Sequence, residues 1–163
     1  AEEFPSWGYE IRCGATTIWE RWDGWNEHLG LQSAEMNSFN HYSLGAVGEW
    51  LFRNLGGINE AAPGFTRVKI APEFSDAIPT VRTRLESIRG VVSSERWRDG
   101  KSLHLRCRVP VGVAAEVCIP TTDPNCVREL GASAGPPVIE STNGGLRYLV
   151  GSGVWHFTWP SEN

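Results

Sequence analysis

The sequence lacks the features that mark several large classes of protein. No apolar run approaches the ~18 residues that a membrane-spanning helix requires. Lysine and arginine are not clustered, and the formal net charge is −4 with a pI near 5.6, so we expect no nucleic acid and no membrane as partner. Residues 1–5 have neither an initiator methionine nor the pattern of a signal peptide, which predicts a chain trimmed from a longer one.

Metal-binding patterns are missing too. The four cysteines (Cys13, Cys107, Cys118 and Cys126) form no C-x-x-C pair, and no two histidines have metal-ligand spacing, so we predict no metal and no cofactor. Cys107 and Cys118 have opposite strand parity, which places them on opposite faces and disfavours a disulfide between them. A bridge from Cys118 to Cys126 stays an alternative to our expectation of free thiols throughout.

What the sequence does have, near its start, is a carboxylate between two indoles. Glu20 lies between Trp19 and Trp22, and Asp23 and Glu27 follow it at spacings of three and seven, so all three acids share one face if the run is helical. Aromatic faces stack on sugar rings and shield a carboxylate from water, which raises its pKa and suits acid/base catalysis. From composition alone we favour the competing interpretation, a helix start with solvated acids and core tryptophans.

Residues 1–62 carry a helical pattern. Residues 5–8 should break any early helix, and Thr16 or Thr17 can cap a first helix. A second helix is predicted to begin at a cap among residues 37–40 and to end in a left-handed cap at Gly56 and Gly57. Its apolar positions are spaced three and four apart: Leu44, Val47, Leu51 and Leu55.

The tryptophans are concentrated in this helical part. Five of the eight lie in the first 50 residues, and two helices cannot bury such an indole-rich surface by themselves. We therefore expect Trp19, Trp22 and Trp50 to be exposed or to be covered by self-association of this face.

From about residue 63 the apolar spacing changes to two, which predicts an antiparallel β-sandwich or jelly-roll. Hairpin turns are expected at residues 99–100 and 143–145, and residues 121–137 show no clear pattern. Trp97, Trp155 and Trp159 are expected in the core, with His104 on the polar face of its strand. The predicted strands are residues 66–71, 81–87, 91–97, 102–109, 114–119, 146–150 and 154–159.

Two longer motifs carry a family resemblance. The strings GATTIWERWDGW (residues 14–25) and SFNHYSLGAVGEWLF (residues 38–52) resemble the end of the catalytic domain of inverting bacterial α-L-rhamnosidases, the family 78 glycoside hydrolases. Four weaker strings extend the resemblance over nearly the whole chain: GFTRVKIAP, IRGVVSSERW, VPVGVAAEVCIP and YLVGSGVWHF. The resemblance implies that residues 1–62 are the last helices of an incomplete (α/α)6 barrel and that residues 63–163 are the C-terminal β-sandwich.

The resemblance also implies roles for individual residues. Glu20 matches the general base that activates the attacking water, and His41 matches a histidine that contacts the substrate. Trp19 and Trp22 are expected at the substrate site as walls or core rather than as stacking platforms. Asp23 and Glu27 match no catalytic acid, and we expect them to be solvated. The general acid of the family lies upstream of Ala1.

Two functions from different classes follow. The first is a C-terminal fragment of a glycoside hydrolase that removes terminal α-L-rhamnose, with the base but not the acid, so that it is inactive without the missing N-terminal part. The alternative is a non-catalytic carbohydrate-binding or structural β-sandwich module. Convergence of Glu20 and His41 would favour the first, and exposed aromatic side chains after residue 63 would favour the second.

Overall fold

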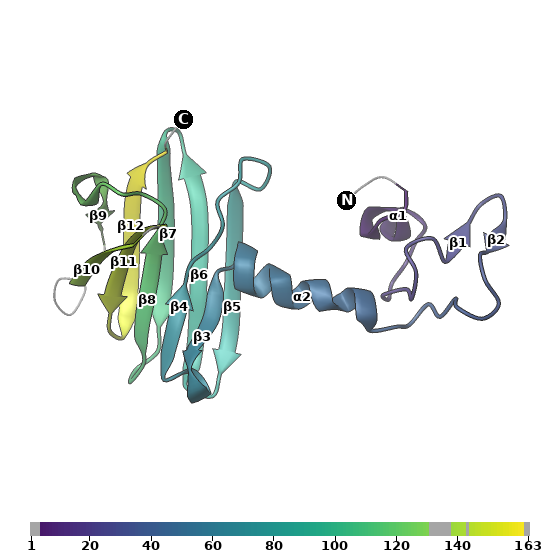
Figure 1. The fold of residues 1–163 in the computed structure, drawn as a ribbon, viewed down its shortest axis with the longest axis horizontal. Helices are drawn as coiled ribbons and strands as arrows, with labels where there is room; N and C mark the ends of the chain where they lie inside the picture. Colours follow the sequence, from purple (N-terminus) through teal and green to yellow (C-terminus); the bar gives the residue numbers. More distant parts are fainter. Residues whose placement is uncertain (1–3, 131–137, 143, 162–163) are drawn as a thin grey trace. The chain divides into compact units, whose positions relative to one another are not determined.

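The computed structural model describes residues 4–130, 138–142 and 144–161 (Figure 1). The chain forms two compact units, Ala1–Glu49 and Trp50–Asn163. A helical part precedes two mostly antiparallel sheets, which confirms the predicted fold class. Among the described residues, no helix has the length and apolar character needed to cross a membrane. The predicted domain division after residue 62 stays a prediction.

The first unit begins with helix α1 (Trp7–Arg12), so the prediction that residues 5–8 break any early helix is wrong. Ser6 explains the difference, because its side-chain oxygen accepts a hydrogen bond from the Tyr9 N–H at 3.1 Å and caps the first turn. Two short antiparallel strands follow in this unit, β1 (Trp25–Asn26) and β2 (Gly30–Leu31).

The predicted helix after Thr16 or Thr17 is also wrong, because residues 14–24 form turns and bends. Their backbone groups bond to a distant segment: the His41 N–H donates to Ile18 O at 2.8 Å, and the Glu20 N–H donates to Ser38 O at 2.8 Å. A backbone group bonded across the fold in this way is not available for a helical hydrogen bond. The three acids of this stretch therefore do not share a helix face.

The clearest predicted helix is present, but it begins later than expected. Helical turns run continuously through η1 (Ser43–Ala46), α2 (Val47–Trp50) and η2 (Leu51–Leu55), the last of which is a π-turn. The N-cap position is Tyr42, whose side chain makes no capping bond, and the Ser38 hydroxyl accepts from the Asn40 N–H at 3.3 Å instead. At the other end the left-handed residue is Gly57, with φ 71°, whereas Gly56 stays right-handed.

The second unit is a sandwich of two five-stranded sheets, whose strands run vertically and overlap in the view of Figure 1. Sheet I has the strand order β10-β11-β8-β4-β3, and sheet II has the order β5-β6-β7-β12-β9. The strands of sheet I are β3 (Ile58–Ala62), β4 (Arg67–Ile70), β8 (Ala114–Ile119), β10 (Val138–Thr142) and β11 (Gly145–Val150). The strands of sheet II are β5 (Thr80–Ser87), β6 (Gly90–Asp99), β7 (Ser102–Val109), β9 (Arg128–Glu129) and β12 (Gly153–Pro160). The 3₁₀ turns η3 (Pro63–Phe65) and η4 (Pro124–Cys126) lie between strands.

One strand pair departs from the predicted antiparallel arrangement. Strands β4 and β8 are parallel, with Val68 opposite Ala115 and Ile70 opposite Val117. The chain leaves sheet I after β4, builds the β5-β6-β7 meander of sheet II, and returns to β8 beside β4. A connection of this length permits parallel pairing, which a tight turn does not.

All seven predicted strands are confirmed to within two residues at either end, whereas β3, β9 and β10 of the sandwich, and β1 and β2 of the first unit, were not predicted. The hairpin turn at Asp99 and Gly100 is confirmed, because Asp99 pairs with Ser102 and Gly100 has φ 57°. Of the other predicted turn, Asn143 lies outside the described residues, and Thr142 pairs with Gly145.

The core lies between the two sheets. Leu105 and Phe157 reach it from sheet II and meet Val117 and Tyr148 of sheet I, with the Tyr148 and Phe157 ring centroids 4.9 Å apart. The buried aromatic face of the last strand is confirmed: Trp155, Phe157 and Trp159. Cys107 belongs to this core, and burial raises the pKa of its thiol to about 12. All four cysteines are free thiols, as expected.

Trp97 is not in the core, so that prediction is wrong. The preceding residue, Arg96, takes the inward position and is buried, with its guanidinium 5.3 Å from the centre of the Phe74 ring and Nη1 donating to Ile78 O at 2.8 Å. Because strand residues alternate between faces, Trp97 then points outward, where it stacks on His104.

Candidate functional site

The two long motifs lie side by side in the first unit. Besides the two backbone hydrogen bonds that join residues 18–20 to residues 38–41, the Ser38 N–H donates to Glu20 Oε2 at 3.1 Å. The Thr17 hydroxyl donates to Phe39 O. The structure therefore brings the segments that carry Glu20 and His41 together, although 20 residues separate them in the sequence.

Glu20 is held by its backbone and by one carboxylate oxygen. Its N–H and its Oε2 both bond to Ser38, and the residue is half-buried. In the part of the chain that the structure describes, Oε1 of Glu20 makes no hydrogen bond. A carboxylate fixed on one oxygen and open on the other can accept a proton from a water molecule.

The prediction that Trp19 is exposed is wrong. Trp19 is only 6% exposed and packs against Phe39, with ring centroids 4.8 Å apart. Its partner Phe39 comes from the second motif, so the pairing of the two segments is what covers the indole. Trp22 is 36% exposed and meets Trp7 edge-on at 5.2 Å, and Trp50 is 47% exposed, as predicted for both.

Asp23 is ion-paired rather than solvated, which corrects the expectation for this residue. Arg21 binds it through two bonds, Nε to Oδ1 at 2.9 Å and Nη2 to Oδ2 at 3.0 Å, and this carboxylate raises the pKa of the guanidinium. An acid neutralised by a bidentate arginine is poorly placed for proton transfer. Glu27 is exposed, as expected.

The His41 ring is oriented by its neighbours. Its Nε2 lies 3.1 Å from the Ser43 hydroxyl, and the ring stacks on Tyr42 at 5.3 Å with an 18° interplanar angle. Tyr42 itself is 85% exposed. An imidazole held at Nε2 keeps Nδ1 for a further partner, such as a sugar hydroxyl.

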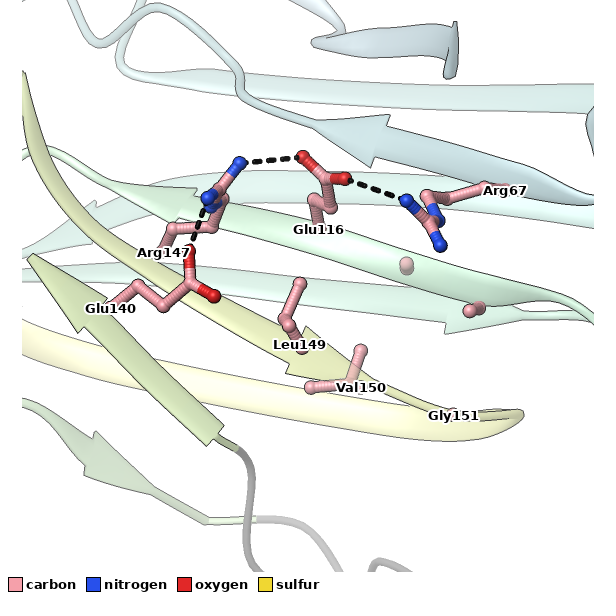
Figure 2. A pocket seen from close by; sticks show the side chains of 9 residues that line it. Arg67, Glu116, Glu140, Arg147, Leu149, Val150 and Gly151 are labelled. Atoms are coloured by element: carbon pink, nitrogen blue, oxygen red, sulfur yellow. Dashed lines mark hydrogen bonds and ion pairs between the residues drawn. The ribbon is translucent and has the colours of Figure 1, made fainter. Parts of the chain in front are cut away.

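The outer face of sheet I has a pocket lined by charged side chains (Figure 2). Arg67 contacts Glu116 at 3.7 Å, Arg147 contacts the other oxygen of Glu116 at 3.3 Å, and Arg147 also pairs with Glu140. The four charged side chains of the pocket thus form ion pairs with one another. No aromatic residue lines the pocket. Among the described residues from 63 onward, every exposed large apolar side chain is aliphatic. Trp97 points outward but is half-buried, so the described residues from 63 onward present no fully exposed aromatic side chain of the kind that would favour a carbohydrate-binding module.

The outer face of sheet II brings together two histidines that are far apart in the sequence. His104 Nδ1 lies 3.3 Å from His156 Nε2, and the Trp97 ring stacks on His104 at 4.8 Å. Sequence spacing gave no sign of this pair, because it depends on the register of β7 against β12. Burial lowers the pKa of His156, and the neighbouring His104 and Arg106 lower it further.

This pair predicts a loss of stability in mild acid. As the pH falls below about 6.5, the unfolded chain binds a proton that His156 resists in the folded state, so the free energy of unfolding decreases. We expect the melting temperature of the chain to fall between pH 7.5 and pH 5.5, and to fall less in His156→Gln. Thermal melts of both proteins across this range test it. The other titrating groups affect both proteins equally. An equal fall in melting temperature with pH in the wild type and in His156→Gln would therefore show that His156 does not contribute.

Two family models match most of the chain, one after the other. The bacterial alpha-L-rhamnosidase 6 hairpin glycosidase domain matches residues 1–55, and the bacterial alpha-L-rhamnosidase C-terminal domain matches residues 57–133. The chain belongs to the bacterial α-L-rhamnosidase family. Glu20 and His41 both fall within the match to the glycosidase domain.

Individual α-L-rhamnosidases agree with this assignment. One from Streptomyces avermitilis is 39% identical over 155 residues, which cover 95% of this chain and 15% of that protein. One from Formosa agariphila is 38% identical over 120 residues, which cover 74% of this chain and 13% of that protein. The crystal structure of the Streptomyces avermitilis α-L-rhamnosidase complexed with L-rhamnose has a TM-score of 0.84 and 38% identity over 97% of this chain and 15% of that one. The chain thus spans about 15% of the length of these relatives.

Proposed function

We propose that this chain is the C-terminal part of an inverting glycoside hydrolase that releases terminal α-L-rhamnose, with Glu20 as its general base. The observation that carries the proposal is the pairing of the Glu20 and His41 segments, inside the part of the chain that matches the glycosidase domain. The chain spans only about 15% of the length of these relatives. This supports the proposal that the rest of the active site comes from another part of the same enzyme.

The chemistry assigns one step to Glu20. In an inverting reaction a carboxylate takes a proton from water while the water attacks the anomeric carbon, and an acid protonates the departing oxygen. The two carboxyl groups stand about 6.5–9.5 Å apart to admit that water. Glu20 has an open oxygen for this role, whereas Asp23 is neutralised by Arg21.

His41 and Trp22 are proposed to hold the sugar. His41 can donate from its imidazole to a rhamnose hydroxyl, with the ring fixed by Ser43 and Tyr42. The partly exposed indole of Trp22 is proposed to form one wall of the sugar site. Trp19 is buried and is proposed to support the site by packing against Phe39. The general acid is proposed to come from the part of the enzyme outside this chain.

The test compares the chain with the full-length enzyme. These 163 residues alone should give no measurable turnover of an aryl α-L-rhamnoside, because losing one catalytic partner costs about 10²–10⁴ in rate and losing the rest of the binding shell costs more. The full-length enzyme should hydrolyse the same compound and release β-L-rhamnose first, which proton NMR detects. Turnover by the isolated chain, or release of α-L-rhamnose first, would contradict the assignment.

A further inference from the structure

The outer face of sheet II holds two histidine nitrogens at the separation of two ligands on one metal ion. His104 Nδ1 lies 3.3 Å from His156 Nε2. Nitrogen ligands stand about 2.0–2.1 Å from a tetrahedral zinc ion, which places any two of them about 3.3–3.4 Å apart. The same separation is long for a hydrogen bond, whose usual range is about 2.7–3.2 Å to an oxygen acceptor. The spacing of the two nitrogens therefore fits a shared ion.

The sheet fixes this separation. Strands β7 and β12 are both interior strands of sheet II and pair antiparallel, with His104 opposite Thr158 and His156 opposite Arg106. The two histidines are thus diagonal neighbours on one face, from which long side chains reach each other across two strands. An ion between them needs no rearrangement of the backbone, so little ordering opposes its binding.

Trp97 restrains the first of the two rings. Its indole stacks on the His104 ring, with centroids 4.8 Å apart and 4° between the planes, and its centroid lies 5.1 Å from that of His156. Trp97 lies directly opposite His104 on β6, so the strand register sets this contact as well. An imidazole packed flat against an indole loses most of its rotational freedom, which preorganises its nitrogen as a ligand.

The charges around the pair permit a bound cation. A histidine binds a metal ion only in its neutral form. Burial lowers the pKa of His156, and His104 and Arg106 lower it further, so its ring is uncharged at pH 7. Arg106 would repel a cation, but its guanidinium is ion-paired with Glu95. The negative charges of Glu129 and Glu95 act in the opposite direction and favour positive charge at this place.

We propose that His104 and His156 bind one divalent transition-metal ion, of which Zn²⁺ fits best, and that this ion clamps β12 to β7. Imidazole nitrogen is a ligand that Zn²⁺, Cu²⁺ and Ni²⁺ accept, whereas Mg²⁺ and Ca²⁺ prefer oxygen. In the described part of the chain, no group of three or more histidine, cysteine, aspartate or glutamate side chains is placed to hold an ion, so water completes the coordination.

This site was hidden from the sequence and is independent of the proposed function. The two histidines are 52 positions apart, which is why spacing along the chain predicted no metal. Both lie outside the segment that matches the glycosidase domain. The clamp therefore concerns the stability of the sandwich and not the reaction assigned to Glu20.

The experiment titrates zinc chloride into the 163-residue chain, prepared without a polyhistidine tag. Isothermal titration calorimetry should show one ion bound per chain. With zinc in about hundredfold excess over Kd, the melting temperature should rise by about 5 °C or more, because the ion binds the folded pair and not the separated histidines. Magnesium chloride at the same concentration should change neither measurement.

Three matched substitutions locate the ion. His104→Gln and His156→Gln each remove one ligand and keep a polar side chain, and each should raise Kd for Zn²⁺ at least about tenfold and abolish the rise in melting temperature. His28→Gln removes an exposed imidazole of the first unit and should leave both at wild-type values. NMR of the imidazole nitrogens needs no variant: in the wild-type chain, zinc should shift the resonances of His104 Nδ1 and His156 Nε2 and leave those of His28 unchanged.

Several results would overturn the inference. No zinc binding to the wild-type chain would do so, as would wild-type affinity in both variants of the pair. Loss of binding in only one of those two variants would mean that the two nitrogens do not share an ion. A loss in His28→Gln as large as in the pair would place the ion elsewhere. None of these results bears on the proposed function, and wild-type kcat in Glu20→Gln, which would reject that function, would leave the metal site standing.

Discussion

Glu20→Gln in the full-length enzyme is expected to lower kcat for an aryl α-L-rhamnoside by about 10²–10⁴-fold. The amide keeps the shape of the side chain and can still accept from the Ser38 N–H, but it cannot take a proton from water. KM should change little, because the substitution removes an interaction made only in the transition state. Steady-state kinetics, with circular dichroism to verify the fold, measures the effect.

Glu27→Gln is the matched control for this prediction. Glu27 is another carboxylate of the same unit, seven residues further along the chain, and it is exposed. The same chemical change there should leave both kcat and KM at wild-type values. Wild-type turnover in Glu20→Gln, or an equal loss in the two variants, would show that Glu20 is not the base.

Gly57→Ala is expected to be the most destabilising single substitution that we predict in the sandwich. Gly57 has φ 71°, and a Cβ atom there would lie 2.1 Å from Pro72 N and 2.5 Å from the carbonyl carbon of Ala71. Both neighbours are backbone atoms, so the strand ends would have to separate and strain the Ala71 N–H to Gly57 O bond. We expect a loss of about 4–5 kcal/mol or more. Thermal denaturation of the chain should show a melting temperature lower by about 15 °C or more.

Gly112→Ala separates the two causes of this loss. Gly112 has φ 76°, close to that of Gly57, but a Cβ atom there meets nothing within 4 Å. Its substitution should cost only the strain of the left-handed backbone, about 1–2 kcal/mol. Similar melting temperatures for the two variants would mean that the close approach of Pro72 does not constrain the fold.

The strands of the sandwich were predictable because their pattern is local. In β7 and β8 inward and outward residues alternate without interruption, and turn residues mark the ends, so the bounds of both strands were predicted to the residue. Strand β9 has only two residues and was missed, since a run so short carries no periodicity. Trp97 was misplaced for a different reason: hydrophobicity assigned it inward, whereas the alternation of β6 buries Val92, Ser94 and Arg96 instead.

The first unit was less predictable because its interactions are not local. Residues 14–24 have a helical spacing of acids and indoles, yet their backbone bonds to residues 38–41, and no pattern within the segment contains that information. Glu20, His41, Trp19 and Trp22 were selected by motif, and the structure adds which of them is buried and what holds each one.

The parallel pairing of β4 with β8 constrains the order in which the sandwich can assemble. Strands β5, β6 and β7 are joined by tight hairpins and can pair as soon as they are synthesised. Strand β8 reaches β4 only after the whole meander between them has been ordered. Pairing β8 with β4 therefore carries the entropic cost of closing that long loop. The β5-β6-β7 meander, rather than the whole of sheet II, is therefore formed before sheet I is completed, and the exposed edge of β4 is open to non-native pairing until β8 arrives.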